Sequence, residues 1–159
     1  LLHMLCLVTS MSPEPVPFLN GETYWQTFGQ LVPRYMWPEK PRGHLSTYTL
    51  SIHYGLQNEE ATQATTIAFG FLPEAYANFG IWGAAIIGAL FAAIYKVLVS
   101  YSRNSPMLSY GGICVVMVTA WSYQTELTMS IWLTSLFQAL AATVGVVWGP
   151  RKMMQVDPR

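Results

Sequence analysis

Three long stretches of the chain contain no Asp, Glu, Lys or Arg, namely residues 75–95, 104–125 and 127–150. Each exceeds the roughly 20 apolar residues that a helix needs to cross the hydrocarbon core of a bilayer. A backbone in lipid must satisfy its own hydrogen bonds, and a helix does so within one segment. The pattern predicts helices near residues 79–100, 107–123 and 129–148.

The alternative is a soluble bundle of three buried helices, in which each helix would normally carry a polar face. None of the three stretches shows such a face. Only 10% of the residues are charged, against about 25% in a typical soluble domain. We therefore expect an all-α fold of polytopic membrane helices, three complete and one truncated.

The apolar residues 1–8 are too few to cross a membrane and lack the basic start of a secretory signal. They resemble the end of a transmembrane helix whose beginning is missing. The predicted organisation is this helix end at 1–8, a long extracytoplasmic loop at 9–74, three transmembrane helices within 75–150 and a tail at 151–159. On this interpretation the chain is the C-terminal part of a longer membrane protein.

Basic residues set the predicted orientation, because Lys and Arg beside membrane helices tend to stay in the cytoplasm. The connection after the first helix and the C-terminal tail carry Lys96, Arg103, Arg151, Lys152 and Arg159. The turn at 124–128, on the opposite side, has no basic residue and one acid, Glu126. The bias places the C-terminus in the cytoplasm and the 9–74 loop outside it.

Charge and motif content exclude several classes of function. The formal net charge is zero, which excludes nucleic-acid binding by bulk charge. Cys6 and Cys114 lie far apart in apolar runs, so neither a disulfide framework nor a CxxC metal site is predicted. No HExxH, GxGxxG or Walker sequence occurs, and we predict no bound metal and no cofactor.

The predicted loop at 9–74 differs from the rest in composition. It holds seven of the ten prolines and many aromatic residues, so we expect an ordered, irregular segment with short helices rather than disorder. Loops of this length in compact proteins are usually functional. Residues 24–32 have the apolar spacing of a helix that lies flat on a membrane surface, and Pro33 should end that helix.

A rigid basic turn follows this helix. Arg34, Lys40 and Arg42 lie among three prolines that restrict the backbone. Arginine matches phosphate oxygens with a planar fork and lysine supplies a mobile point charge, so the turn predicts binding of a lipid-linked phosphate or pyrophosphate. Contact with anionic lipid headgroups, or a salt bridge between Arg34 and a glutamate of the loop, would explain the same charges.

Two motifs resemble a known family. Pro33-Arg34-x-x-Trp37-Pro38-x-Lys40-Pro41 is similar to the PRxxWPxKP stretch of the bacterial oligosaccharide repeat-unit polymerases, the O-antigen (Wzy-type) polymerase group. The run Pro73-Glu74-Ala-Tyr76-Ala-Asn78-Phe79-Gly80-x-x-Gly83 resembles the start of a transmembrane helix in that family. The resemblance covers about residues 20–150, and the chain would be the C-terminal portion of such a protein.

The resemblance implies a glycosyltransferase of the bacterial inner membrane that acts at its outer face in lipopolysaccharide or other polysaccharide biosynthesis. It would move a glycan from undecaprenyl pyrophosphate onto the next lipid-linked repeat unit. Its partners would be that lipid-linked oligosaccharide, membrane lipids and a chain-length regulator. Arg34, Lys40 and Arg42 are expected to stabilise the pyrophosphate leaving group, and Trp37, Tyr76 and Asn78 to bind substrate.

The acceptor hydroxyl needs a general base. Glu74 is the first candidate because Pro73 suits a helix start and Asn78 lies one turn further on the same face. Its alternative role is to complement the dipole of that helix. His44 and His53 are alternative bases with a suitable titration range. Glu126 is a further candidate, or simply faces water, and the neighbouring acids Glu59 and Glu60 are predicted to be solvated.

Two other functions compete with the polymerase. One is a transporter or flippase subunit for a lipid-linked glycan, and the other is a non-enzymatic membrane component of polysaccharide export. A transporter should carry charged or polar groups near the middle of its helices. The three predicted helices have no charged residue at their centres, which favours chemistry at the membrane surface.

Overall fold

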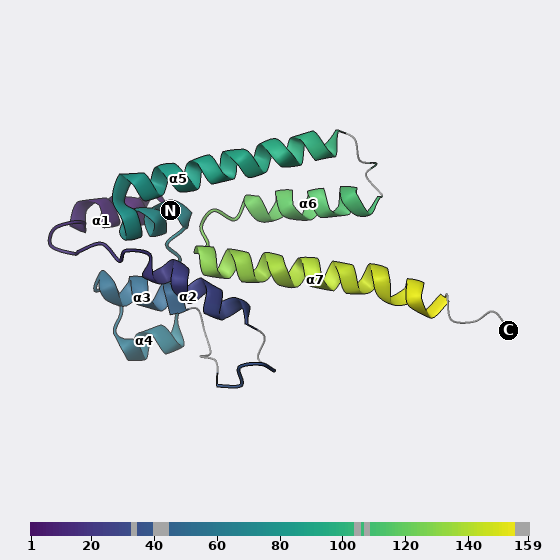
Figure 1. Ribbon diagram of the computed structural model, residues 1–159. Helices are drawn as coiled ribbons and strands as arrows, with labels where there is room; N and C mark the ends of the chain where they lie inside the picture. Colours follow the sequence, from purple (N-terminus) through teal and green to yellow (C-terminus); the bar gives the residue numbers. More distant parts are fainter. Residues whose placement is uncertain (33–34, 40–44, 104–105, 107–108, 155–159) are drawn as a thin grey trace.

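The computed structural model of the protein describes residues 1–32, 35–39, 45–103, 106 and 109–154 (Figure 1). All regular elements in these ranges are helices, which confirms the all-α prediction for the described part of the chain. They are α1 (Leu2–Met11), α2 (Glu22–Leu31), α3 (Leu45–His53), α4 (Glu59–Ala64), α5 (Phe71–Ser102), α6 (Tyr110–Ser122) and α7 (Met129–Met154). Figure 1 shows α5, α6 and α7 side by side, with α1–α4 gathered where α5 begins. We call residues 1–70 the cap and α5–α7 the bundle.

Each of the three predicted long helices is present, and the short helices predicted for the loop are α2, α3 and α4. Three predicted boundaries fall inside helices. Helix α1 continues past residue 8 to Met11, α5 already begins at Phe71 before the boundary at 74/75, and α7 continues past residue 150 to Met154. At α1 the reason is local. Thr9 Oγ1 donates to Leu5 O at 2.8 Å and Ser10 Oγ to Leu7 O at 2.9 Å, so both hydroxyls are satisfied within a helix.

The prediction of several complete membrane spans is matched only in part. In the described ranges, α5 is the helix long and apolar enough to cross a membrane. Helix α6 has 13 residues, which is roughly 20 Å of helix and shorter than the hydrocarbon core of about 30 Å. The structure thus establishes one candidate span.

Helix α5 is broken at Gly80, where φ is 62° and ψ is −147°. Only glycine adopts this backbone conformation readily. The break leaves the carbonyls of Ala77 and Asn78 to other donors, and Leu19 N and Asn20 N bind them at 3.0 and 3.1 Å. Residues 81–102 then measure roughly 33 Å, which matches a bilayer core. The short part, 71–79, is set apart from residues 81–102 by the break.

Two apolar clusters hold the molecule together. The cap cluster joins α1, α3 and the first part of α5 through Val8, Leu50, Tyr54, Phe69 and Ala77. The bundle cluster lies where α5, α6 and α7 meet and is built from Phe71, Ala75, Ile87 and Trp132, with Phe91 packed against it. Both clusters draw residues from the first part of α5, which therefore connects cap to bundle.

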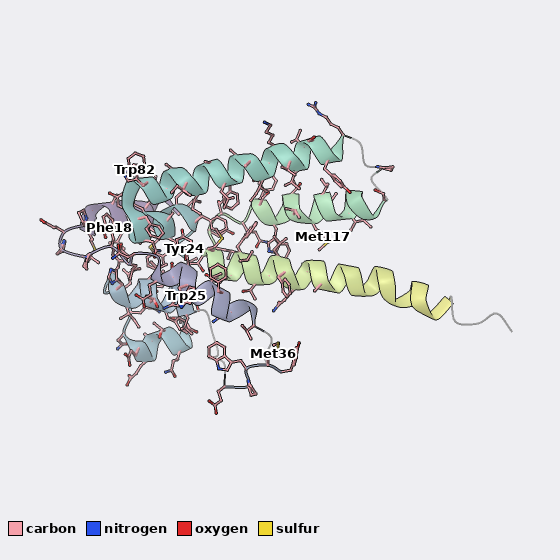
Figure 2. The ribbon with its side chains drawn as sticks, in the orientation of Figure 1. Phe18, Tyr24, Trp25, Met36, Trp82 and Met117 are labelled. Atoms are coloured by element: carbon pink, nitrogen blue, oxygen red, sulfur yellow. The ribbon has the colours of Figure 1, made fainter. Side chains whose placement is uncertain are left out.

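Beyond this junction, α5 exposes large apolar side chains. Ile81, Trp82, Ile86 and Val97 are 65–75% exposed, and Figure 2 shows Trp82 pointing away from the rest of the molecule. Large apolar side chains exposed in this number on one helix are typical of a membrane or protein contact.

Candidate functional site

The site is built around the start of α5, which the turn before α7 holds in place. Phe71 N donates to Thr125 O at 3.2 Å. The preceding Gly70 has φ 92°, and a Cβ there would lie 2.9 Å from the same carbonyl oxygen, so glycine is required for this close approach. The acidic residue of the first turn of α5 is Glu74, which the contact brings to the start of α7.

Glu74 is fully buried and its carboxyl group caps a different helix from its own. Met129 N, at the first residue of α7, donates to Glu74 Oε2 at 2.6 Å. A carboxyl at a helix N-terminus satisfies an otherwise unpaired amide and complements the dipole. The predicted dipole role thus holds for α7 rather than for α5. The other oxygen, Oε1, is buried and has no hydrogen-bond partner among the described residues.

Asn78 ties the same turn of α5 to α2. Its Nδ2 donates to Thr23 Oγ1 at 2.8 Å and to Glu74 O at 2.8 Å. Its Oδ1 accepts from Gly21 N at 3.0 Å. Asn78 and Thr23 are both fully buried. Glu74, Asn78 and Thr23 therefore join α2, α5 and α7 at one point, which we call the junction triad.

The backbone geometry of this junction requires glycine at both Gly80 and Gly83 of the second motif, Pro73–Gly83. Gly80 permits the break described above. At Gly83, a Cβ would collide with the carbonyl oxygen of Ala75. The long part of α5 therefore approaches its own first part as closely as backbone allows. The spacing Glu74-x-x-x-Asn78-x-Gly80-x-x-Gly83 describes the parts of one folded junction.

Burial is the main influence on the pKa of Glu74 in the triad and on the pKa of the neighbouring Tyr24. It raises the pKa of Glu74 from about 4.5 to about 7, and the Met129 amide and the nearby Thr23 hydroxyl act in the opposite direction. A buried carboxylate with few compensating donors loses more solvation than it regains. Burial, together with the charge of Glu74, also raises the pKa of Tyr24 well above its usual value. The carboxyl group of Glu74 is thus poised to change protonation near neutral pH.

An apolar cavity of about 480 Å³ lies beside the triad. It is open to the outside and lined by helices α2, α5 and α7, and its lining comprises Tyr24, Thr27, Phe28, Phe79, Gly83, Ile86, Ile87, Leu90, Phe91, Ile94, Met129, Trp132 and Leu133. Tyr24 stacks on Phe79 with ring centroids 6.0 Å apart; Figure 2 labels Tyr24 between α2 and the start of α5. Because Met129 lines the cavity and its amide binds Glu74 Oε2, the carboxyl group lies close behind the cavity wall.

The predicted phosphate-binding residues lie outside the described residues. These are Arg34, Lys40 and Arg42, together with the alternative base His44. The helix before them behaves as predicted, since α2 ends at Leu31 and Val32 is extended with ψ 124°. A residue that precedes proline favours this extended conformation.

The remaining predicted substrate-binding residues separate into three places. The structure brings Asn78 to Glu74, as its spacing predicted. Tyr76 lies elsewhere, half-buried against the cap cluster and edge-to-face with Phe18 at 6.1 Å. Trp37 is 42% exposed and lines a second cavity with residues of α2.

The alternative base His53 already has a hydrogen-bond partner, and the other acidic residues considered are exposed to solvent. His53 Nε2 lies 2.8 Å from Pro17 O, so this ring contributes to the packing of α3 against the segment before α2. Glu59 and Glu60 begin α4 and are exposed, as expected, and Glu126 is also exposed. Among the described residues no group of three or more His, Cys, Asp or Glu side chains is placed to hold a metal ion.

Sequence reasoning missed three members of the site. Thr23 and Thr27, one helical turn apart on α2, are both buried although the helix exposes Trp25 and Phe28. This inverted polarity was a usable signal, because a polar pair on one face of an aromatic helix indicates a buried polar contact. The amide of Met129 gave no signal, because it is brought to Glu74 by packing across 55 residues of chain.

No protein-family model matches the sequence, and neither curated proteins nor solved structures give a match. The similarity to the polymerases therefore rests on the two sequence motifs. Of these, the second now has the structural explanation given above.

Proposed function

We propose that the chain is part of a membrane glycosyltransferase that polymerises lipid-linked oligosaccharide repeat units at the outer face of the bacterial inner membrane. The observation that carries the proposal is the position of a protonatable carboxyl group, Glu74, directly behind an apolar cavity of about 480 Å³. This volume falls in the range of ligand pockets, roughly 300–1,000 Å³. A lipid-linked sugar phosphate needs such a combination of apolar space and headgroup chemistry.

The proposed topology follows from charge and apolar surface. Residues 81–102 of α5 cross the membrane, with α6 and α7 beside them, and Lys96 and Arg103 lie at the cytoplasmic end. The cap, the junction triad and the turn at 124–128 lie at the outer end. The lipid chain occupies the apolar cavity and its pyrophosphate faces the outer surface.

The proposed reaction is displacement at the anomeric carbon of the donor glycan. The acceptor hydroxyl forms the new C–O bond, the bond from carbon to the phosphate oxygen breaks, and undecaprenyl pyrophosphate leaves with that electron pair. Glu74 takes the proton of the hydroxyl, because a base with a pKa near the working pH is the most effective. Arg34, Lys40 and Arg42 stabilise the charge that develops on the leaving group.

Arg34→Ala tests the assignment of the basic turn. In cells that rely on this protein for chain extension, the variant should leave a single repeat unit on the lipopolysaccharide, seen as loss of the ladder on a gel. The control is Arg103→Ala, which removes an exposed cation at the opposite end of α5. A full ladder from Arg34→Ala, with normal amounts of protein in the membrane, would refute the role of Arg34.

Glu74→Gln separates proton transfer from structure. Glutamine retains an oxygen that accepts from Met129 N but does not titrate. If Glu74 is the base, this variant loses extension, and the rate of the wild-type protein rises with pH through about 7. Normal extension by Glu74→Gln would leave Glu74 as a structural residue.

A further inference from the structure

Helix α2 turns aromatic rings outward and hydroxyl groups inward. Trp25 and Phe28 are 78% and 62% exposed, whereas Thr23 and Thr27 are almost completely buried. A helix packed on a core in water normally shows the reverse arrangement, with its apolar side facing the core. The outward side of α2 is therefore suited to apolar surroundings.

The segment after α2 extends this surface. Tyr35, Met36 and Trp37 are all exposed, and Trp37 packs against α2 at Gly29, where a Cβ would lie 3.5 Å from its ring. Trp37 and Trp25 line one cavity, and Figure 2 shows Trp25 on α2 and Met36 on the neighbouring segment. We give the name aromatic face to Trp25, Phe28, Tyr35, Met36 and Trp37.

The contacts of α2 show at which level of the molecule the aromatic face lies. At the start of α2, Gly21 N donates to Asn78 Oδ1 at 3.0 Å, before the break in α5. Further along, Phe28 shares the wall of the apolar cavity with residues of α5 as far as Ile94. Helix α2 thus runs from the junction to a level beside residues 81–102, and Figure 1 shows it along the first turns of α7.

We propose that the aromatic face inserts into the outer leaflet of the membrane, at the boundary between the headgroups and the acyl chains. Tryptophan and tyrosine prefer this layer because their rings are apolar and their N–H and O–H groups reach the headgroups. Two exposed acidic residues lie beside the face in the sequence, Glu22 and Glu39. A carboxylate is costly in the hydrocarbon core, so the face lies at the boundary and not deeper.

Phospholipid fits the aromatic face better than a polar ligand does. Gln26, the polar residue next to Trp25 on α2, is already paired. Its Nε2 donates to Thr49 Oγ1 at 3.0 Å and to Glu22 Oε1 at 3.3 Å, and its Oε1 accepts from Thr49 Oγ1 at 3.2 Å. This amide is therefore not available to the hydroxyl groups of a ligand, whereas contact with acyl chains needs ring surface alone.

This inference rests on the topology of the proposed function, in which residues 81–102 cross the membrane with the junction at the outer end. It adds that α2, which forms one wall of the apolar cavity, is held in the outer leaflet. That is the leaflet in which the proposed lipid-linked donor is anchored.

The accessibility of a nitroxide spin label tests the aromatic face directly. In a protein with Cys6→Ser and Cys114→Ser, the label is attached at Trp25→Cys or at Trp37→Cys. The protein is placed in nanodiscs of phosphatidylethanolamine and phosphatidylglycerol. Both labels should collide with oxygen rather than with a water-soluble nickel chelate, at a depth of about 5–10 Å in the boundary layer.

Two reference positions distinguish this proposal from the proposed function. Ala93→Cys on α5 is the reference for lipid and Gln63→Cys on α4 the reference for water, since both positions are exposed. If positions 25 and 37 behave like position 63 while position 93 contacts lipid, the aromatic face is refuted and the span is retained. If position 93 is also in water, the face and the proposed topology both fail. Lipid contact at 25 and 37 in a protein that does not extend lipid-linked glycans would retain the face and refute the polymerase.

Tryptophan emission gives a second measurement that needs no cysteine. Trp25→Phe/Trp37→Phe keeps an apolar ring at both positions and should therefore fold. The double variant should lose emission that brominated phospholipid quenches in the wild-type protein. Loss of unquenched emission alone would place both indoles in water and overturn the proposal.

Discussion

The cap and the long part of α5 differ in how completely they bury their side chains. In the cap, Thr23, Thr27, Thr47 and Ser51 are almost completely buried. In the bundle, the long part of α5 turns large apolar residues outward. The cap also exposes Trp25 and Phe28 on α2, and the bundle also buries Ser122 and Ser130. The clearest difference is therefore between the long part of α5, which is largely exposed, and the elements packed around its first part.

The junction triad lies where these two regions meet. Glu74 and Asn78 belong to the helix that becomes the bundle, yet they bond to Thr23 of the cap and to the first amide of α7. The change from buried to exposed side chains along α5 thus coincides with the break at Gly80 and with the buried carboxyl. Substitutions in the junction triad should therefore have different effects from substitutions within the cap or the bundle alone.

The largest effect is expected at Asn78. Replacement by alanine leaves Gly21 N and the Thr23 hydroxyl without their buried partner, so we expect about 4 kcal/mol of destabilisation. The control is Asn58→Ala, which removes a single exposed cap on α4 and should cost about 1 kcal/mol. Thermal unfolding in detergent measures both, and equal losses would contradict a special role for the triad.

A charge placed on each region should distinguish lipid from water. Ala93 and Gln63 are both exposed, one in the middle of the long part of α5 and the other on α4. Ala93→Asp should reduce membrane insertion by about 3 kcal/mol, while Gln63→Asp changes stability by less than about 0.5 kcal/mol. An insertion assay with a glycosylation reporter makes the comparison. Equal tolerance at both positions would mean that α5 does not cross the membrane.

A smaller effect is expected from glycines of α5. Gly83→Ala drives a methyl group into the Ala75 carbonyl and should cost about 2 kcal/mol. A methyl group at Gly88 would meet no described atom within 4 Å, so Gly88→Ala should be neutral or stabilise by up to about 1 kcal/mol through helix propensity. Melting temperatures of the two variants test this, and a stable Gly83→Ala protein would contradict the close approach at the junction.

Sequence patterning predicted the bundle well and the junction poorly. The apolar runs gave the three helices, and the proline at position 33 gave the end of α2, because both signals are local. The break at Gly80 was not predicted, since a single glycine in an apolar helix is usually accommodated without one. The contact between Glu74 and Met129 depends on how α5 and α7 pack, which no local pattern encodes.

The candidate site shows the same division. The i, i+4 spacing predicted that Glu74 and Asn78 share a face of α5, and they do. Tyr76, two residues from each, was also expected to bind substrate, but two steps along a helix place it against the cap cluster instead. Trp37 was predicted to bind substrate because it belongs to the first motif, residues 33–41. Only the structure shows that it shares a cleft with Trp25.

Titration of Glu74 tests the central claim most directly, namely that an ionisable group is buried where cap and bundle meet. Infrared difference spectra between the wild-type protein and Glu74→Gln report the protonated carboxyl as a function of pH, and the midpoint should lie near 7. Since the unfolded chain titrates near 4.5, the wild-type protein should lose about 3 kcal/mol of stability between pH 4.5 and 7, and little beyond. Glu74→Gln should lack this slope. A midpoint near 4.5, with no difference in slope, would contradict the account.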